Sequence, residues 1–199
     1  MGEQAMATQN PKHEQALAWA IGEIGVKEDP LGKNTGPRVR EYQSQGTWLS
    51  GTGWAWCAAF ANLAVIKGGF TGLDRTAGAW DALARAAKKG WAVQPEHYTK
   101  AIPGDLVVFS VGSGHVSVLE RPVSGAIVET VDGNASDQVK RCQRPLSSVK
   151  GFICWPEDGA HGGEGRKPLA QVVGGESGRR KLVVGPIKVP LPTVHDKVT

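Results

Sequence analysis

The stretch that decides the fold runs from residue 54 to residue 69 and reads Trp54-Ala-Trp-Cys-Ala-Ala-Phe-Ala-Asn-Leu-Ala-Val-Ile-Lys-Gly-Gly69. Its residues are almost all apolar and it ends in a pair of glycines, so it predicts a buried helix. Cys57 falls in the first turn of this helix. The positive dipole end and exposed N–H groups of a helix start lower the pKa of a cysteine from its usual value of about 8.5. The stretch therefore predicts a helix with a reactive thiol at its N-terminus.

Two more helices are predicted before this stretch. The first begins at the capping pair Asn10-Pro11 and ends at Gly25, with His13 on its polar side. The second begins at Gly36-Pro37. Its inward-facing residues are Val39 and Tyr42.

A fourth helix is predicted after this stretch, from about Ala77 to Lys89. Its expected buried face consists of Trp80, Leu83 and Ala87. Beyond Pro95 the hydrophobic pattern changes from a helical period to the period of two that is typical of strands. The predicted strands are residues 105–110, 115–121, 126–132, 138–143 and 149–155. Helices first and strands second predict an α+β domain, with N-terminal helices packed on a C-terminal antiparallel sheet.

Length and composition limit the organisation of the chain. Its 199 residues suffice for one full domain, or for one domain and a tail. Residues 1–10 are expected to be a flexible N-terminus, residues 11–156 the folded domain, and residues 157–199 a Gly-rich basic linker or tail. Within that tail, residues 181–189 are a candidate edge strand. The chain is expected to be a monomer.

Charge and hydropathy exclude two classes of partner. The net charge of +4 favours an anionic surface, but it is too small to argue for a nucleic acid. No apolar run approaches the roughly 18 residues that a membrane span needs, so no span is predicted.

A nucleophilic cysteine needs a base, and only one of the five histidines, His115, begins a strand inside the predicted core. If residues 122–125 form a four-residue hairpin loop, His115 faces Asp132 on the same side of the sheet. Asn134, just past the end of that strand, competes for the same imidazole. A Cys, a His and an orienting Asp or Asn form the triad of a thiol hydrolase. The predicted catalytic residues are therefore Cys57, His115, and Asp132 or Asn134.

The remaining cysteines and a short acidic row offer weaker signals. Cys142 and Cys154 are expected on neighbouring strands, either as core residues or as a single disulfide bridge. A weak candidate for a calcium site consists of Glu28, Asp29 and Asn34, although the row lacks the regular alternation of a calcium loop.

Several short motifs follow one another between about residues 12 and 156. They are Ile24-Gly-Val-Lys-Glu28, Asn34-Thr-Gly-Pro-Arg-Val-Arg-Glu-Tyr42, Trp56-Cys-Ala-Ala-Phe60, Pro103-Gly-Asp-Leu-Val-Val-Phe109, Gly114-His115-Val, Asp132-Gly-Asn134 and Gly151-Phe-Ile153. Together they resemble the CHAP (cysteine, histidine-dependent amidohydrolase/peptidase) domains of the papain-like NlpC/P60 superfamily.

This resemblance implies a papain-like α+β fold that cleaves peptidoglycan without a cofactor or metal. The cleaved bond is expected to be that of an N-acetylmuramoyl-L-alanine amidase or of a peptide endopeptidase. Cys57 takes the position of the family's nucleophile and His115 that of its base. The family usually has Glu-Gly-Asn where this chain has Asp132-Gly-Asn134, so either residue remains a candidate for orienting His115. The candidate substrate-binding residues are Trp56, Tyr42 and Asn34.

The expected biological setting is a phage lysin, such as an endolysin, or a bacterial wall-degrading effector. The alternative is a non-catalytic phage-tail or secreted structural or binding protein that keeps the fold. The polar residues 1–10 lack the layout of a secretory signal. We therefore expect synthesis in the cytoplasm and action on the cell wall or periplasm after lysis, injection or dedicated secretion. The expected partners are peptidoglycan and, through the basic tail, anionic wall polymers.

Overall fold

The computed structural model describes residues 10–156 as four α-helices followed by a six-stranded antiparallel sheet. The helices are α1 (Pro11–Gly22), α2 (Pro37–Gly46), α3 (Cys57–Lys67) and α4 (Ala79–Lys88). The strands are β1 (Ala92–Val93), β2 (Leu106–Phe109), β3 (His115–Leu119), β4 (Ile127–Asp132), β5 (Lys140–Pro145) and β6 (Val149–Ile153), with short 3-10 helices η1 (Pro95–Lys100) and η2 (Leu146–Ser148). The predicted α+β class is confirmed.

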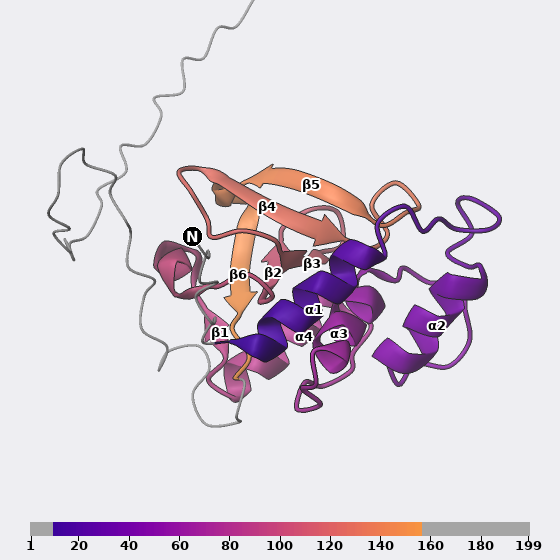
Figure 1. The fold of residues 1–199 in the computed structure, drawn as a ribbon, viewed down its shortest axis with the longest axis horizontal. Coiled ribbons are helices and arrows are strands. Elements are labelled where there is room, and N and C mark those ends of the chain that lie inside the picture. The colour runs from indigo at the N-terminus through magenta and orange to yellow at the C-terminus, as the bar shows by residue number, and fades with distance from the viewer. Residues whose placement is uncertain (1–9, 157–199) are drawn as a thin grey trace, which may run out of the picture. The chain divides into compact units, whose positions relative to one another are not determined.

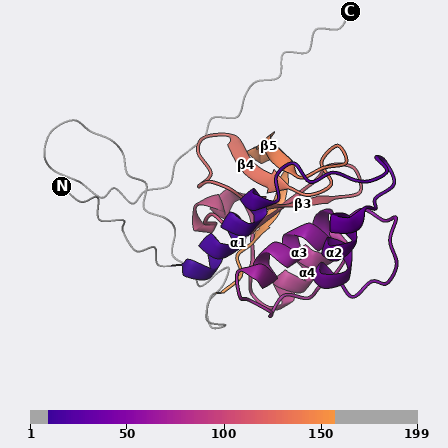
Figure 2. The same cartoon turned by 45° about the vertical axis from the view of Figure 1, so that its right-hand side comes forward.

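The helices and the sheet form two layers (Figure 1). The sheet order is β1-β6-β2-β3-β4-β5, so β3 lies inside the sheet while β5 lies at its edge. Helices α1 and α3 both contact β3, α4 contacts β6, and α2 packs on α3. Figure 2 shows α2, α3 and α4 together on one side of β3, β4 and β5. The central strand β3 therefore meets the start of the most buried helix.

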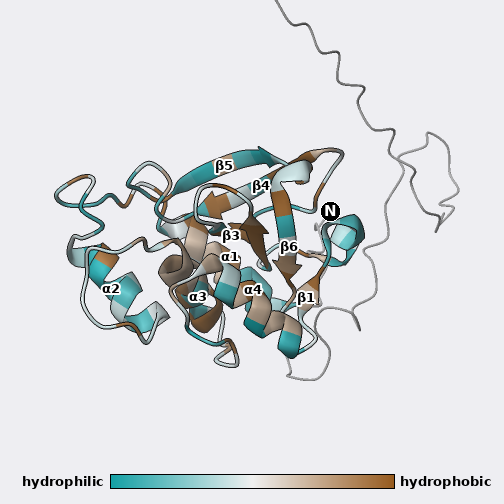
Figure 3. Cartoon of the chain, turned by 180° about the vertical axis from the view of Figure 1, so that it is seen from behind, coloured by the Kyte–Doolittle hydropathy of each residue, from teal (hydrophilic) through white to brown (hydrophobic). Residues whose placement is uncertain are grey.

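The inner strands are buried on both faces of the sheet, which explains their continuous apolar sequence. Alternate residues such as Val108 and Val116 join the core between the sheet and the helices. Their neighbours Val107 and Phe109 join a second core on the opposite face. The edge strand β5 instead alternates between half-buried and exposed residues, and it is largely hydrophilic in Figure 3.

His13 is buried, so the prediction that it lies on the polar side of α1 is wrong. Its side chain is 1% exposed, and its Nε2 lies 3.1 Å from Asp105 Oδ1. Its ring also stacks on Trp155 with 3.6 Å between the ring centroids and an angle of 8° between the planes. A buried polar group needs a partner of this kind. Here the partners come from distant parts of the chain, which a local helical pattern does not show.

Helix α4 presents a different face to the core from the predicted one. Ala79, Ala82 and Ala86 are buried, whereas Trp80 is 39% exposed and Ala87 is also exposed. Small alanine side chains let the helix approach its neighbours closely, and the larger Trp80 lies at the rim. The predicted buried face is therefore correct only for Leu83, which is half-buried.

Residues 1–9 and 157–199 lie outside the described residues, so the flexible N-terminus, the basic tail and the candidate edge strand at residues 181–189 stay predictions. Among the described helices, none combines the length and the apolar character that a membrane crossing requires.

Candidate active site

Cys57 is the first residue of α3, as the sequence predicts. The helix contacts β3 and β4, and Cys57 is 6% exposed. The preceding residue, Trp56, makes no side-chain capping bond to the first turn. The positive end of the helix dipole therefore acts on the Cys57 sulfur without a competing side-chain cap, which favours the thiolate.

The pKa values of Cys57 and His115 are shifted toward each other. Burial raises the pKa of the Cys57 thiol, but the hydrogen bond and charge of His115, with backbone hydrogen bonds from Val116 and Ala58, lower it below its usual value. Burial lowers the pKa of His115, but Asp132 and Cys57 raise it to about 9. These shifts favour a thiolate beside an imidazolium, the reactive form of a cysteine nucleophile.

Asp132 holds His115, although the predicted strand register is wrong. Strands β3 and β4 pair Val118 with Val131, and this register, continued, sets His115 opposite Asn134. His115 Nε2 nevertheless lies 2.8 Å from Asp132 Oδ2. The predicted register is wrong by two residues. Because side chains alternate between faces with a period of two, Asp132 stays on the same face of the sheet as His115. The two residues become diagonal cross-strand neighbours, which an imidazole can still reach.

The Asp132 carboxylate is fully buried and has two further partners. Arg144 Nη2 lies 2.6 Å from its Oδ2, and the Thr130 hydroxyl donates to its Oδ1 at 2.6 Å. Burial raises the pKa of Asp132, but His115 and Arg144 lower it to about 2. The carboxylate is therefore ionised at neutral pH. No motif marks Thr130 or Arg144, because only the folded sheet brings them to Asp132.

Asn134 belongs to a second network, beneath the start of α3. When the amide nitrogen of Asn134 faces the Glu28 carboxylate, this nitrogen donates to Glu28 Oε1 at 3.2 Å. The amide oxygen of Asn134 then accepts from the Trp56 backbone N–H, also at 3.2 Å. The Trp56 indole also donates to Glu28 Oε1 at 2.9 Å, and the Asn34 backbone N–H donates to Oε2 at 2.8 Å. Asn134 therefore joins the end of β4 to the helix start and to the loop before α2.

Trp56 and Tyr42 are not available to a substrate in this structure, so the prediction that they bind it is wrong. Both side chains are 0% exposed, and their rings lie 5.4 Å apart. The Tyr42 hydroxyl donates to Glu23 at 2.6 Å. These two side chains pack in the core next to the N-terminus of α3. Asn34 is half-buried, and its role as a substrate ligand stays a prediction.

Glu28, Asp29 and Asn34 do not fit a calcium site. Both carboxylate oxygens of Glu28 accept hydrogen bonds from protein donors. One of these donors is the backbone N–H of Asn34, so Asn34 faces Glu28 with a donor and not with a ligand oxygen. Asp29 is exposed. Within residues 10–156, no three His, Cys, Asp or Glu side chains gather as metal ligands.

Trp80 lies against Gly114, the residue before His115, although the sequence pattern places it in the core. A Cβ at Gly114 would lie 2.7 Å from Trp80 Nε1, and Gly114 has a φ of +101°, so only glycine fits there without strain. Gly114 directly precedes His115. The partly exposed indole therefore packs against the backbone that leads into His115. The glycine before His115 is the sequence signal for this contact.

Cys142 and Cys154 do not lie on neighbouring strands, contrary to the prediction. Cys142 belongs to β5 and Cys154 follows β6, and three other strands separate these two in the sheet. All three cysteines lie within the described residues and form no disulfide. Cys154 is a core residue, which was one of the two predicted alternatives. Cys142 is half-buried, and burial together with Asp132 raises its pKa.

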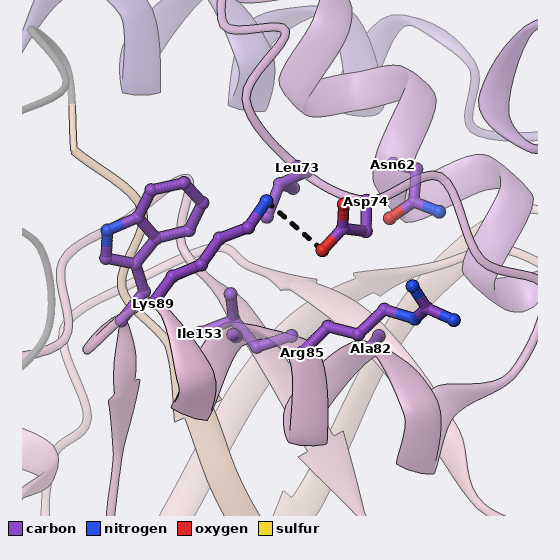
Figure 4. A pocket seen from close by; sticks show the side chains of 9 residues that line it. Asn62, Leu73, Asp74, Ala82, Arg85, Lys89 and Ile153 are labelled. Carbon is purple, nitrogen blue, oxygen red and sulfur yellow. Dashed lines mark ion pairs between the residues drawn. The ribbon is translucent and has the colours of Figure 1, made fainter.

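A small pocket near the C-terminal half of α4 is separate from these residues (Figure 4). Its lining includes Lys89, whose Nζ lies 3.1 Å from Asp74 Oδ2. Neither Cys57 nor His115 lines it. We therefore place the candidate active site at the start of α3.

Comparison with protein-family models agrees with this fold. The family model of the CHAP domain matches residues 49–134, a range that contains Cys57, His115 and Asp132. Searches of curated proteins and of solved structures gave no match. CHAP domains are generally hydrolases that act on peptidoglycan. The helices and antiparallel sheet also agree with the papain-like fold of that family. Over residues 49–134 the chain therefore matches the CHAP domain family.

Proposed function

We propose that the chain is a cysteine-dependent hydrolase of peptidoglycan, acting as an N-acetylmuramoyl-L-alanine amidase or as a peptide endopeptidase. The observation that carries the proposal is the connected arrangement of Cys57, His115 and Asp132. Cys57 interacts with His115, and His115 Nε2 lies 2.8 Å from Asp132. The geometry supplies a nucleophile, a base and a group that orients the base.

In the proposed mechanism the Cys57 thiolate attacks the carbonyl carbon of the scissile amide. The backbone N–H of Cys57, at the helix start, donates to the oxyanion that forms. The His115 imidazolium then protonates the leaving amine, and the acyl group stays on the sulfur as a thioester. Water attacks this thioester while His115 accepts its proton, which releases the carboxylic acid and restores the thiolate. Asp132 stabilises the imidazolium in each step.

In this proposal the chain works in the cell wall or periplasm, as a phage lysin or as a bacterial wall-degrading effector. Its substrate is peptidoglycan, and anionic wall polymers are a second partner through the basic tail. That tail lies outside the described residues.

Purified peptidoglycan sacculi provide the direct test. We expect the wild-type chain to lower their turbidity and the Cys57→Ala variant to have no effect while keeping the same melting transition. The His97→Ala variant is a matched control, because His97 is an exposed histidine of η1. If the wild-type chain binds sacculi but releases no fragment, the chain is the non-catalytic alternative instead.

Mass spectrometry of the released fragments separates the two bond types. An amidase frees intact stem peptides whose N-terminal residue is alanine and leaves sugar chains without peptide. An endopeptidase leaves part of each peptide attached to the sugar.

A further inference from the structure

Arg144 reaches the candidate active site from the edge of the sheet. It lies on β5 opposite Val128 of β4, and its Nη2 is 2.6 Å from Asp132 Oδ2. Its guanidinium carbon lies 4.8 Å from the centre of the Phe109 ring, a distance typical of a cation–π contact. The side chain is 19% exposed. The arginine is thus held over the sheet face, with one nitrogen directed at the carboxylate.

The buried charges balance only when Arg144 is counted. A Cys57 thiolate and a His115 imidazolium cancel each other, which leaves the buried Asp132 carboxylate as an excess negative charge. A buried charge without a partner is strongly unfavourable. Arg144 is the cation that compensates it, and it binds the same oxygen as His115 Nε2.

We propose that Arg144 is a positioning residue: it holds the ionised Asp132 carboxylate against His115 and, through its positive charge, sets the pH range in which Cys57 is a thiolate. For turnover this inference rests on the proposed function. For the ionisation of Cys57 it does not depend on turnover.

The direction of the effect follows from the groups that face one another. Asp132 is faced by His115 from β3 and by Cys142 and Arg144 from β5, and His115 is faced by Cys57 from α3. Removing the arginine charge destabilises the carboxylate and the thiolate and leaves the imidazolium more strongly stabilised. The pKa values of these groups therefore all rise.

Four variants test the proposal. Arg144→Met and Arg144→Gln remove the charge, the second with a hydrogen-bond donor retained so that the test survives if the first does not fold. Arg144→Lys keeps the charge without the planar fork. Arg141→Met is the matched control. Arg141 is three residues from Arg144 on the same strand, so its side chain lies on the opposite face of the sheet. There it forms an exposed ion pair with Glu120 at 2.7 Å.

The readout is the rate at which iodoacetamide alkylates Cys57, followed by peptide mass spectrometry as a function of pH. We expect its midpoint to rise by about one pH unit in Arg144→Met and Arg144→Gln, by less in Arg144→Lys, and to stay unchanged in Arg141→Met. Below the midpoint a one-unit rise slows alkylation about tenfold. An unchanged midpoint in the two neutral variants, or an equal shift in Arg141→Met, overturns the proposal.

The same variants are then assayed for kcat/KM on a soluble muropeptide across pH. In the neutral variants we expect both the acidic and the basic limb of the pH–activity profile to move to higher pH. A merely structural role would instead lower activity equally at every pH. Alkylation needs no turnover, so a wild-type chain that fails to cleave peptidoglycan refutes the proposed function and leaves the test of Arg144 intact.

Discussion

Gly133 lies directly against Phe60, since a Cβ at Gly133 would be 2.5 Å from the Phe60 Cβ. Phe60 is in the first turn of α3, which Cys57 begins, and Gly133 stands between Asp132 and Asn134. This contact sets how closely the strand that carries the carboxylate approaches the helix that carries the thiol.

Replacing Gly133 by alanine should therefore disturb both stability and activity. We expect Gly133→Ala to lower the free energy of unfolding by about 1–3 kcal/mol, because the new methyl group overpacks the contact. Urea denaturation measures this loss. Gly22→Ala is the control, since nothing lies within 4 Å of a Cβ at that position. Equal losses in the two variants would contradict the role of the contact.

The two residues flanking Gly133 should differ in their effect on catalysis. We expect Asp132→Asn to lower kcat/KM by about a hundredfold or more, because the amide cannot stabilise the imidazolium. Asn134→Ala should cost less, since Asn134 bonds to Glu28 and Trp56. Steady-state kinetics on a soluble muropeptide compare the two. A larger loss at Asn134 would show that the second network controls the chemistry.

Stability should depend on pH through His115. Its pKa is raised from 6.5 to about 9, so the protonated form stabilises the fold. This contribution is complete below the unfolded pKa of 6.5 and is lost as pH rises toward 9. We expect the free energy of unfolding to fall across this window in the wild-type chain and less in His115→Asn. Parallel curves from urea denaturation at several pH values would refute this linkage.

Trp80 should act on substrate binding more than on the chemical step. Its indole is 39% exposed beside Gly114 and makes no bond to the triad that the structure records. Loss of an aromatic contact costs about 1 kcal/mol, so we expect Trp80→Ala to raise KM roughly fivefold with little change in kcat. Trp80→Phe should retain most of the affinity. A fall in kcat at constant KM would instead mean that the indole only holds His115 in place.

Chelation should leave activity unchanged. The Glu28 oxygens already accept hydrogen bonds from Trp56 and Asn34, so they are poor ligands for an added ion. We expect dialysis against EDTA to have no effect on the hydrolysis of sacculi. A loss that calcium restores would reveal a metal site, and the variant Glu28→Gln would then locate it.

The sequence predicts the parts of the site that depend on local pattern. The apolar run with its glycine stop predicts α3 and the place of Cys57, and the period of two predicts the strand that starts at His115. The partnership of His115 with Asp132 is found even though the register is wrong, because a strand alternates its faces every second residue. The connection between the strands is not the assumed four-residue loop, since Ser124 bridges to Ile127, the first residue of β4.

Contacts between distant residues are not predictable in this way. Arg144 and Asp132 come together only through the pairing of β4 with β5, and His13 lies 92 residues from Asp105. Trp80 is misplaced for another reason. Its size suggests burial, but the alanines of α4 occupy the close helix contacts and leave the indole at the rim.

The stacking of His13 on Trp155 has a consequence for folding during synthesis. α1 is the first of the described elements to leave the ribosome, yet the ring that covers its buried imidazole follows the last strand. Until Trp155 is synthesised, His13 lacks the ring that stacks on it, although α3, on which α1 also packs, is already present. The complete packing of α1 therefore needs the end of the described chain, and contacts of such long sequence separation slow folding.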